Sequence, residues 1–355
     1  MKLFKDIAGF VKGKKVFCGI DVHEKKWDVC FICDGEVVQT DGIPAEYSKL
    51  KALLAPYCIS RALEIVYEAG FSGSWLYRRL KQDGYCCTIT PPGLVPVSTD
   101  KVKTNKRDAR KLAWYLSAGL LKSVYVLPDW AESNRRIVRR RSQLVKKSSR
   151  AKNEIRSFLH LHGIKRLSEI KSNWSGLYMK WLDSLEFEFE SDQFVLGQLV
   201  KNYRRLREDV AEVTHQLRSL SKSEAYAANF KRMTAVKGVG LITAMTFLLE
   251  IHDFSRFESS DHFSSLLGLT PSQHSSGEKT RYGHITRQGN AELRRVLIES
   301  AWSVIRHDPH LREKYERIRS RGTNGKKAIV AVARSLAVRM RYCIIHEEDY
   351  VIGVC

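Results

Sequence analysis

The chain has 355 residues, enough for two or three domains, and 43% of them are hydrophobic, which is ordinary for a globular protein and excludes a disordered chain. Its 60 Lys and Arg residues outnumber 39 Asp and Glu residues, so the net charge is +21 and a polyanion is the expected partner. No apolar run is long enough to cross a bilayer and no secretory signal is evident, which predicts a soluble intracellular protein without a membrane partner.

The first 125 residues alternate short strands with helices. Runs rich in β-branched and aromatic residues predict strands at 16–22, 27–33, 36–40, 61–68 and 85–90. Apolar periodicity predicts helices at 45–54, 72–82 and 101–117. Three consecutive strands, then helix, strand, helix and strand, is the order of an RNase H-like fold, so an α/β domain of that class is expected here.

A long helix is predicted next, over 133–162, where the sequence contains neither Gly nor Pro. Its segment 135–152 is rich in cations and has no acid. We predict that these cations contact nucleic acid: Arg135, Arg136, Arg139, Arg140, Arg141, Lys146 and Lys147. A solvated helix face is the plainer interpretation, but a run of one sign without acids favours a phosphate contact.

A second long helix, over 193–220, repeats apolar residues alternately three and four positions apart. The repeat consists of Leu196, Leu199, Tyr203, Leu206, Val210, Val213, Leu217 and Leu220. So strict a seam is typical of a coiled coil, whereas a helix buried in a domain shows a wider stripe. An α-helical coiled-coil middle region, formed within the chain or between subunits, is therefore expected over 126–225.

The last region, 226–355, is predicted to be mostly α-helical, with a polar, glycine-bearing loop at 268–289. The loop contains Ser276 followed by glycine, and three cations that we predict to contact nucleic acid: Lys279, Arg281 and Arg287. A serine in such a loop is usually only part of a turn. As a nucleophile Ser276 would need activation by a metal or a charged neighbour, because no histidine base is adjacent in sequence.

Three carboxylates occupy positions that an RNase H-like sheet would bring together. Asp21 lies in the first strand, Glu68 ends the fourth, and Asp108 lies in the following helix. Asn105, three residues before Asp108, would share its helix face and offers a neutral, weaker oxygen. Each acid alone would be ordinary surface, but the three positions together predict a Mg²⁺ site suited to phosphodiester chemistry.

These motifs, in this order, resemble those of the DEDD-type insertion-sequence transposases. The matching strings are Glu68-Ala69-Gly70, Lys103–Ala109, Gly268–Pro271, Ser275–Gly277 and Ile285–Asn290. The resemblance covers about residues 15–340 and is to the IS110 family, including its IS1111 branch and the related Piv-type DNA invertases.

The resemblance implies a RuvC-like metal-binding domain over 1–125, a basic helix and coiled coil over 126–225, and a transposase domain with a catalytic serine over 226–355. It further implies a recombinase of the bacterial cytoplasm that excises its element and inserts it at a target. In such enzymes a bridge non-coding RNA pairs with donor and target DNA, and a serine–DNA phosphodiester conserves bond energy. The expected assembly is a homo-oligomer, a dimer or tetramer, with active sites shared between subunits.

Carried over residue by residue, Asp21 matches the first acid, Glu68 the second, Asp108 the fourth, and Ser276 the serine of the Ser-Gly motif. The third acidic position holds Asn105, a departure that leaves open whether this position binds metal or whether Asp100 contributes. Adjacent Ser275 is a second candidate nucleophile. We prefer Ser276 because it directly precedes Gly277.

Other functions fit the same residues. One is a Piv-like site-specific invertase and another a junction-resolving nuclease, neither with a guide RNA. A third is a catalytically inactive nucleic-acid-binding protein, with Asn105 as the sign of decay. The intact Asp21, Glu68, Asp108 and Ser276 argue against decay.

Overall fold

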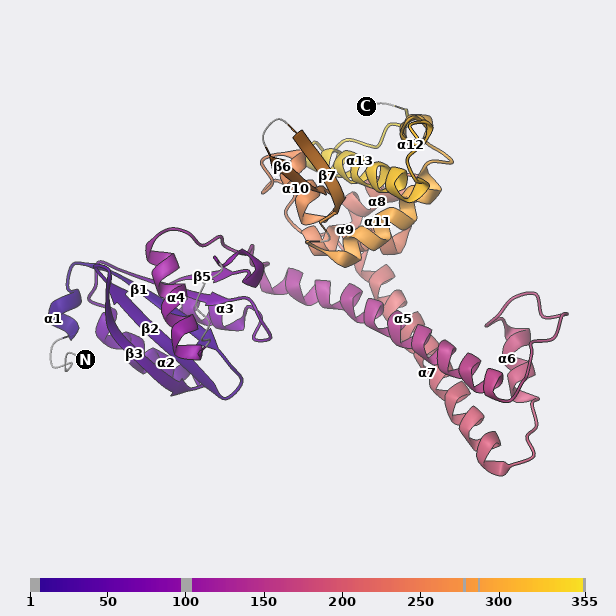
Figure 1. Ribbon diagram of the computed structural model, residues 1–355, viewed down its shortest axis with the longest axis horizontal. Helices are drawn as coiled ribbons and strands as arrows, with labels where there is room; N and C mark the ends of the chain where they lie inside the picture. The colour runs from indigo at the N-terminus through magenta and orange to yellow at the C-terminus, as the bar shows by residue number, and fades with distance from the viewer. Residues whose placement is uncertain (1–6, 97–103, 277–278, 287, 354–355) are drawn as a thin grey trace. The chain divides into compact units, whose positions relative to one another are not determined.

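The computed structural model describes residues 7–96, 104–276, 279–286 and 288–353 (Figure 1). The chain divides into two compact units, Met1–Val126 and Leu127–Cys355, and each is described by itself. In neither unit does the described part contain a helix long and apolar enough to span a bilayer.

The first unit is built on a five-stranded mixed sheet in the order β3-β2-β1-β4-β5. The strands are β1 (Lys15–Val22), β2 (Lys26–Cys33), β3 (Glu36–Pro44), β4 (Ala62–Glu68) and β5 (Cys86–Thr90). β1 runs antiparallel to β2 and parallel to β4, β2 is antiparallel to β3, and β4 is parallel to β5. The five predicted strands and the α/β class of this region are thus confirmed.

Helices cover both faces of this sheet. They are α1 (Ile7–Val11), α2 (Tyr47–Leu54), α3 (Trp75–Gln82), α4 (Asn105–Ser117), and the short 3-10 helices η1 (Ala55–Tyr57) and η2 (Pro92–Leu94). One face packs on α2 and α3 through a buried core in which the rings of Phe31 and Tyr57 stack at 3.9 Å. On the other face Ala109 and Ala113 of α4 contact Cys30 of β2. The small residues on both sides let this helix lie close to the sheet.

The second unit begins with two long helices that lie side by side, α5 (Asp129–Leu161) and α7 (Glu190–Leu220), with α6 (Gly176–Asp183) between them in the sequence (Figure 1). Both predicted long helices are confirmed. In the apolar seam of α7, Leu196, Tyr203 and Leu217 are buried and the other five members are half-buried. Much of the seam is therefore covered within the chain, while a coiled coil in the strict sense stays a prediction.

The rest of the second unit is a helical bundle that also holds a two-stranded ribbon. Its elements are α8 (Ala227–Thr234), α9 (Leu241–Ile251), α10 (Ser260–Leu266), β6 (Pro271–Ser276), β7 (Lys279–Ile285), α11 (Ala291–Val304), α12 (Pro309–Ser320) and α13 (Gly325–Ile345). α9 is buried from Thr243 to Ile251 and packs against α5, α8 and α11. The segment expected to be a loop instead contains the antiparallel pair β6 and β7. Its polar sequence lacks the apolar alternation by which a strand is recognised.

Candidate functional site

Asp21 and Asp108 come together because α4 packs closely on β1. Gly19 and Asp21, two residues apart in β1, face the same side of the sheet. A Cβ atom at Gly19 would clash with the carbonyl oxygen of Ala109 in α4, so this close approach requires glycine. Asp108 is the neighbour of Ala109 in the first turn of α4. The side chains of Asp21 and Asp108 are 17% and 24% exposed, so water screens their charges only in part.

The pKa of Asp21 depends on burial and on the charged groups around its carboxylate. Burial raises the pKa of Asp21 above its ordinary value. The negative charges of Asp108 and Asp28 raise this pKa further, whereas His23, whose Nε2 lies 3.0 Å from Asp21 Oδ2, lowers it. The sheet therefore concentrates negative charge at one end of β1, on the face that α4 covers.

Glu68 lies beside Asp21 on the neighbouring parallel strand. In the register of β1 and β4, Gly19 is opposite Val66 and Ile20 opposite Tyr67. Continuing that register by one position places Glu68 next to Asp21, on the same face of the sheet. The structure thus brings Asp21, Glu68 and Asp108 to one edge of the α4 face.

The fourth expected metal ligand, Asn105, is the first residue of α4 and is exposed. Asp100, the other candidate for this position, lies outside the described residues. Among the described side chains, no three His, Cys, Asp or Glu residues are grouped closely enough to hold a metal ion. The donors at this edge are nevertheless oxygens, which Mg²⁺ prefers, and a cation would relieve the repulsion between Asp21 and Asp108.

Two further residues at this edge were not predicted from the sequence. Asp28 of β2 is directly opposite Asp21, is 2% exposed, and its Oδ1 lies 3.0 Å from Nζ of Lys26. Thr90 of β5 is opposite Glu68 and fully buried, and its hydroxyl finds no hydrogen-bond partner among the described residues. Both positions follow from strand register. Aligning β1 with β2 across their turn, and β4 with β5, would have placed Asp28 opposite Asp21 and Thr90 opposite Glu68.

Ser276, the candidate nucleophile, is the last residue of β6 and pairs with Lys279, the first residue of β7. Ser275 pairs with Thr280. The following Gly277 lies outside the described residues, as does Arg287. Ser276 belongs to the second unit and the acids to the first, so their joint action stays a prediction.

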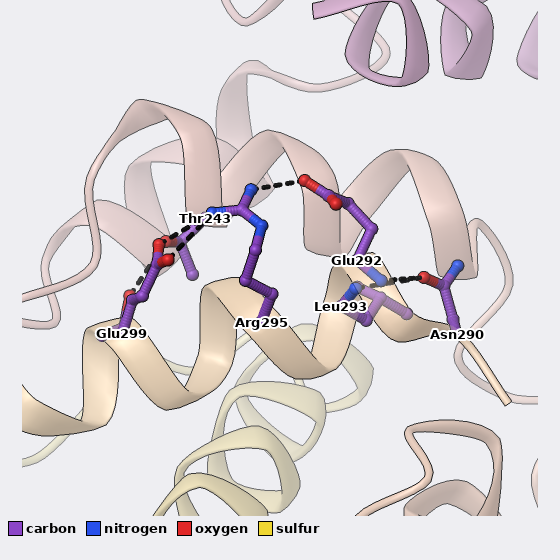
Figure 2. A network of polar contacts seen from close by, with 7 residues as sticks. Thr243, Asn290, Glu292, Leu293, Arg295 and Glu299 are labelled. Carbon is purple, nitrogen blue, oxygen red and sulfur yellow. Dashed lines mark hydrogen bonds and ion pairs between the residues drawn. The ribbon is translucent and has the colours of Figure 1, made fainter. Parts of the chain in front are cut away.

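The base of this ribbon is well anchored. The Thr286 amide donates to the Thr270 carbonyl at 2.9 Å, and the Asn290 amide donates to the Leu266 carbonyl at 2.9 Å. The side chain of Asn290 then caps α11, since its Oδ1 accepts from the amides of Glu292 and Leu293 at 3.0 Å each (Figure 2). The serine ribbon therefore leads directly into a capped helix.

The basic run of α5 contains cations that are paired with other side chains of the chain and cations that are exposed to solvent. Among the paired ones, Arg139 donates from Nε and Nη2 to the two carboxylate oxygens of buried Glu250, both at 2.7 Å, and this hydrogen bonding raises the pKa of Arg139. Arg141 Nε donates to Thr214 Oγ1 at 2.8 Å. Arg135 and Arg136 approach Glu132 at 3.7 and 3.9 Å.

The remaining cations of the run, Arg140, Lys146 and Lys147, are exposed. Among the described residues they form no hydrogen bond like those that tie Arg139 and Arg141 into the fold, so they are better placed to meet a phosphate. In the ribbon, Lys279 and Arg281 lie on β7, where Arg281 pairs with His274. On α11 Arg295 forms ion pairs with Glu292 and Glu299 (Figure 2), which neutralise part of that helix's basic character.

Comparison with known proteins gives matches over both units. Residues 18–164 match the family model named DEDD_Tnp_IS110, described as a transposase, and residues 231–316 match the model described as the transposase IS116/IS110/IS902 family. The protein named Putative transposase y4qE of Sinorhizobium fredii is 33% identical over 84% of this chain and 74% of its own length. The transposase for insertion sequence element IS1111A of Coxiella burnetii is 25% identical over 99% of this chain and 96% of its own length. The transposase for IS1533 of Leptospira borgpetersenii is 28% identical over 81% and 85%.

Proposed function

The chain belongs to the IS110 family of insertion-sequence transposases, enzymes that cleave and rejoin DNA, and on that premise we propose that it is an RNA-guided recombinase with a serine nucleophile. It excises its element and inserts it at a target, and a bridge RNA pairs with both donor and target DNA. The first unit is the RuvC-like domain, which the strand order β3-β2-β1-β4-β5 supports.

The observation that carries the proposal is that the close packing of α4 on Gly19 brings Asp108 near enough to Asp21 for its charge to raise the pKa of Asp21. Asp21, Glu68 and Asp108, with Asn105 as a weaker fourth ligand, are the residues that would hold Mg²⁺. Bound there, the ion would polarise a phosphodiester and neutralise charge developing on it. The protein's part is to gather these oxygens on one sheet face and to keep them partly out of water.

Ser276 is the proposed nucleophile. Its hydroxyl oxygen attacks the phosphorus, which forms a serine–phosphate ester and releases a DNA hydroxyl. A DNA hydroxyl from the other partner then attacks the same phosphorus, releases the serine and rejoins the strand. No bond energy is lost between the two steps, so no external energy source is required.

The exposed cations of α5 are proposed to bind phosphates of DNA and guide RNA. Arg140, Lys146 and Lys147 are the members best placed for this role, together with Arg136, whose side chain stays 70% exposed beside Glu132. Lys279 and Arg281 of β7 are proposed as further contacts from their position in the ribbon. A dimer or tetramer in which one subunit's serine serves another's acids is proposed as the working assembly.

The test is the covalent protein–DNA adduct, which a denaturing gel resolves. Full-length protein is incubated with Mg²⁺, DNA containing the element ends, and the transcript flanking the gene. We expect wild type and Ser275→Ala to form the adduct, and Ser276→Ala and Asp21→Asn to form none. Asp34→Asn, which changes an exposed acid in the β2–β3 turn, serves as the control and should match wild type. An adduct that persists in Ser276→Ala would refute the assignment, and one that is independent of the transcript would refute RNA guidance.

A further inference from the structure

A buried carboxylate, Glu250, joins three elements of the second unit. Its side chain is 2% exposed, near the end of the buried helix α9. Arg139 of α5 donates two hydrogen bonds of 2.7 Å to its two oxygens, and Asn290 Nδ2, at the start of α11, donates a third of 2.8 Å. A carboxylate so far from water depends on such donors, so α5, α9 and α11 are held together at this point.

Asn290 connects this carboxylate to the base of the serine ribbon. While its Nδ2 donates to Glu250, its Oδ1 caps α11 (Figure 2). Its backbone amide donates to the carbonyl of Leu266, the last residue of α10, which precedes the start of the ribbon strand at Pro271. The preceding Gly289 has φ +101°, and a Cβ atom there would clash with the same carbonyl oxygen of Leu266. The segments that lead into and out of the ribbon are therefore joined by the bond between Asn290 and Leu266, and the side chain of this Asn290 donates to Glu250.

We propose that Glu250 is a positioning residue that sets the ribbon carrying Ser276 relative to helix α5. The inference rests on the proposed role of Ser276 as nucleophile. Through Asn290, Glu250 fixes the base of the ribbon and the first turn of α11. Through Arg139 it fixes both to the helix whose exposed cations are proposed to bind nucleic acid. The ion pair between Glu250 and Arg139 thus links the ribbon with the proposed nucleophile to the helix that is proposed to bind the DNA.

The length of the ribbon makes its base a sensitive place. The six residues of β6, from Pro271 to Ser276, are separated by five steps and extend about 17 Å, so a tilt of about 5° at the base moves the tip by about 1.5 Å. A misplacement of about 1 Å at a reacting group can slow a reaction by about 100-fold. Loss of one contact at Asn290 can therefore reduce reaction at Ser276 without any change at the serine itself.

The experiment compares two buried carboxylates of the same bundle. Glu250→Gln keeps the side-chain shape and one acceptor oxygen but removes the charge. Asp308→Asn is the matched control. Asp308 is also 2% exposed, accepts from Arg339 Nη1 at 3.1 Å and from the Tyr350 hydroxyl, and caps α12, but it has no contact with the ribbon among the described residues. Full-length variants are assayed with saturating DNA and guide transcript for adduct rate, DNA affinity and thermal unfolding.

We expect Glu250→Gln to slow adduct formation by about 10- to 100-fold with DNA affinity within about twofold of wild type. Asp308→Asn should lose a similar amount of stability but keep its adduct rate within about threefold. Because Glu250→Gln itself could fail to fold, Asn290→Ser is a second test. Serine retains the helix cap, but its shorter side chain ends before the position of Asn290 Nδ2 and loses the bond to Glu250, so the same slow rate is expected. Arg139→Lys, which keeps the cation, should fall between wild type and Glu250→Gln.

Equal adduct rates in Glu250→Gln and Asp308→Asn, once corrected for the folded fraction, would overturn the positioning role and leave Ser276 as nucleophile. A loss of DNA affinity with an unchanged rate at saturation would do the same. A wild-type protein that forms no Ser276-dependent adduct would instead refute the proposed function, and this inference would fall with it.

Discussion

Carboxylates are held in opposite ways in the two units of the chain. At the end of β1, Asp21 has two acidic neighbours, Asp108 and Asp28, which together with burial raise its pKa. In the helical bundle, Glu250 accepts three hydrogen bonds from Arg139 and Asn290. The first arrangement places negative charges close together, and a bound cation would stabilise them. In the second, the negative charge of Glu250 is already compensated by Arg139 and by the hydrogen bonds that it accepts. Burial alone therefore does not distinguish the proposed metal-binding acid from the ion-paired one, whereas the charge of the neighbouring groups does.

The comparison predicts that loss of charge at Asp21 stabilises the protein, whereas loss of the partner of Glu250 destabilises it. The largest change in activity is also expected at Asp21. Asp21→Asn should reduce adduct formation by at least about 100-fold, since even an outer partner of a metal ligand can contribute a factor of about 10–100. Because the folded-state pKa is raised, ionised Asp21 lowers stability above that pKa, and at pH 7 the neutral Asn should raise the unfolding midpoint. The two readouts are the adduct assay and thermal unfolding without added metal. A lowered midpoint would place Asp21 among the structural acids.

Gly19→Ala tests whether helix packing brings the acids together. The added methyl group would clash with α4 at Ala109, which should lower the free energy of unfolding by about 1–3 kcal/mol and separate Asp108 from Asp21. Adduct formation should fall with it. Gly197→Ala is the control, because its Cβ would meet nothing within 4 Å on helix α7 and should stabilise the protein by about 0.5–1 kcal/mol. Unchanged stability and activity in Gly19→Ala would contradict the close packing of α4.

Arg139→Ala tests the hydrogen-bonded carboxylate Glu250 by removing two of its donors. Among the described residues it leaves Glu250 with one side-chain donor, Asn290, so urea unfolding should show a loss of about 1.5–3 kcal/mol. Arg140→Ala, one position along the same helix and exposed, should change stability by less than about 0.5 kcal/mol. Equal losses in the two variants would mean that the pairing with Glu250 is not special.

The smallest expected effect concerns nucleic-acid affinity. Changing Arg140, Lys146 and Lys147 to Glu should make the dependence of log affinity on log salt less steep by about 2.7, since each phosphate contact contributes about 0.9. The matched control reverses three exposed lysines of the first unit, Lys12, Lys25 and Lys49, with the same change in net charge. If both triple variants shift the salt dependence equally, net charge alone accounts for binding, and α5 is no specific contact surface.

Much of the first unit could be predicted because its strands are apolar runs bounded by turns, and because the order of its elements fixes where strand ends meet. That is why the positions of Asp21, Glu68 and Asp108 in the sheet and in α4 could be predicted from the sequence, while their role as metal ligands stays a prediction. Asp28 was missed because its position opposite Asp21 depends on the geometry of the β1–β2 turn, which the strand pattern alone does not fix.

In the second unit the missing information was long-range pairing. The basic run gave no sign that Arg139 is tied to an acid 111 residues further along, while Arg140 is exposed. Glu250 itself did leave a signal, as a single acid in the apolar helix Leu241–Ile251. A charge at such a position requires a partner, but the sequence does not say which one.

The packing of α4 on the sheet also bears on how the protein is made. β1 is the central strand of the sheet, and α4 packs on the face that includes Gly19 and Cys30. During synthesis the chain emerges from its N-terminus, so this face stays open until α4 has left the ribosome. Only then does Asp108 join Asp21. The nascent chain is thus expected to emerge without a complete acidic site, and a message truncated before α4 would yield a sheet with an apolar face that favours aggregation over DNA cleavage.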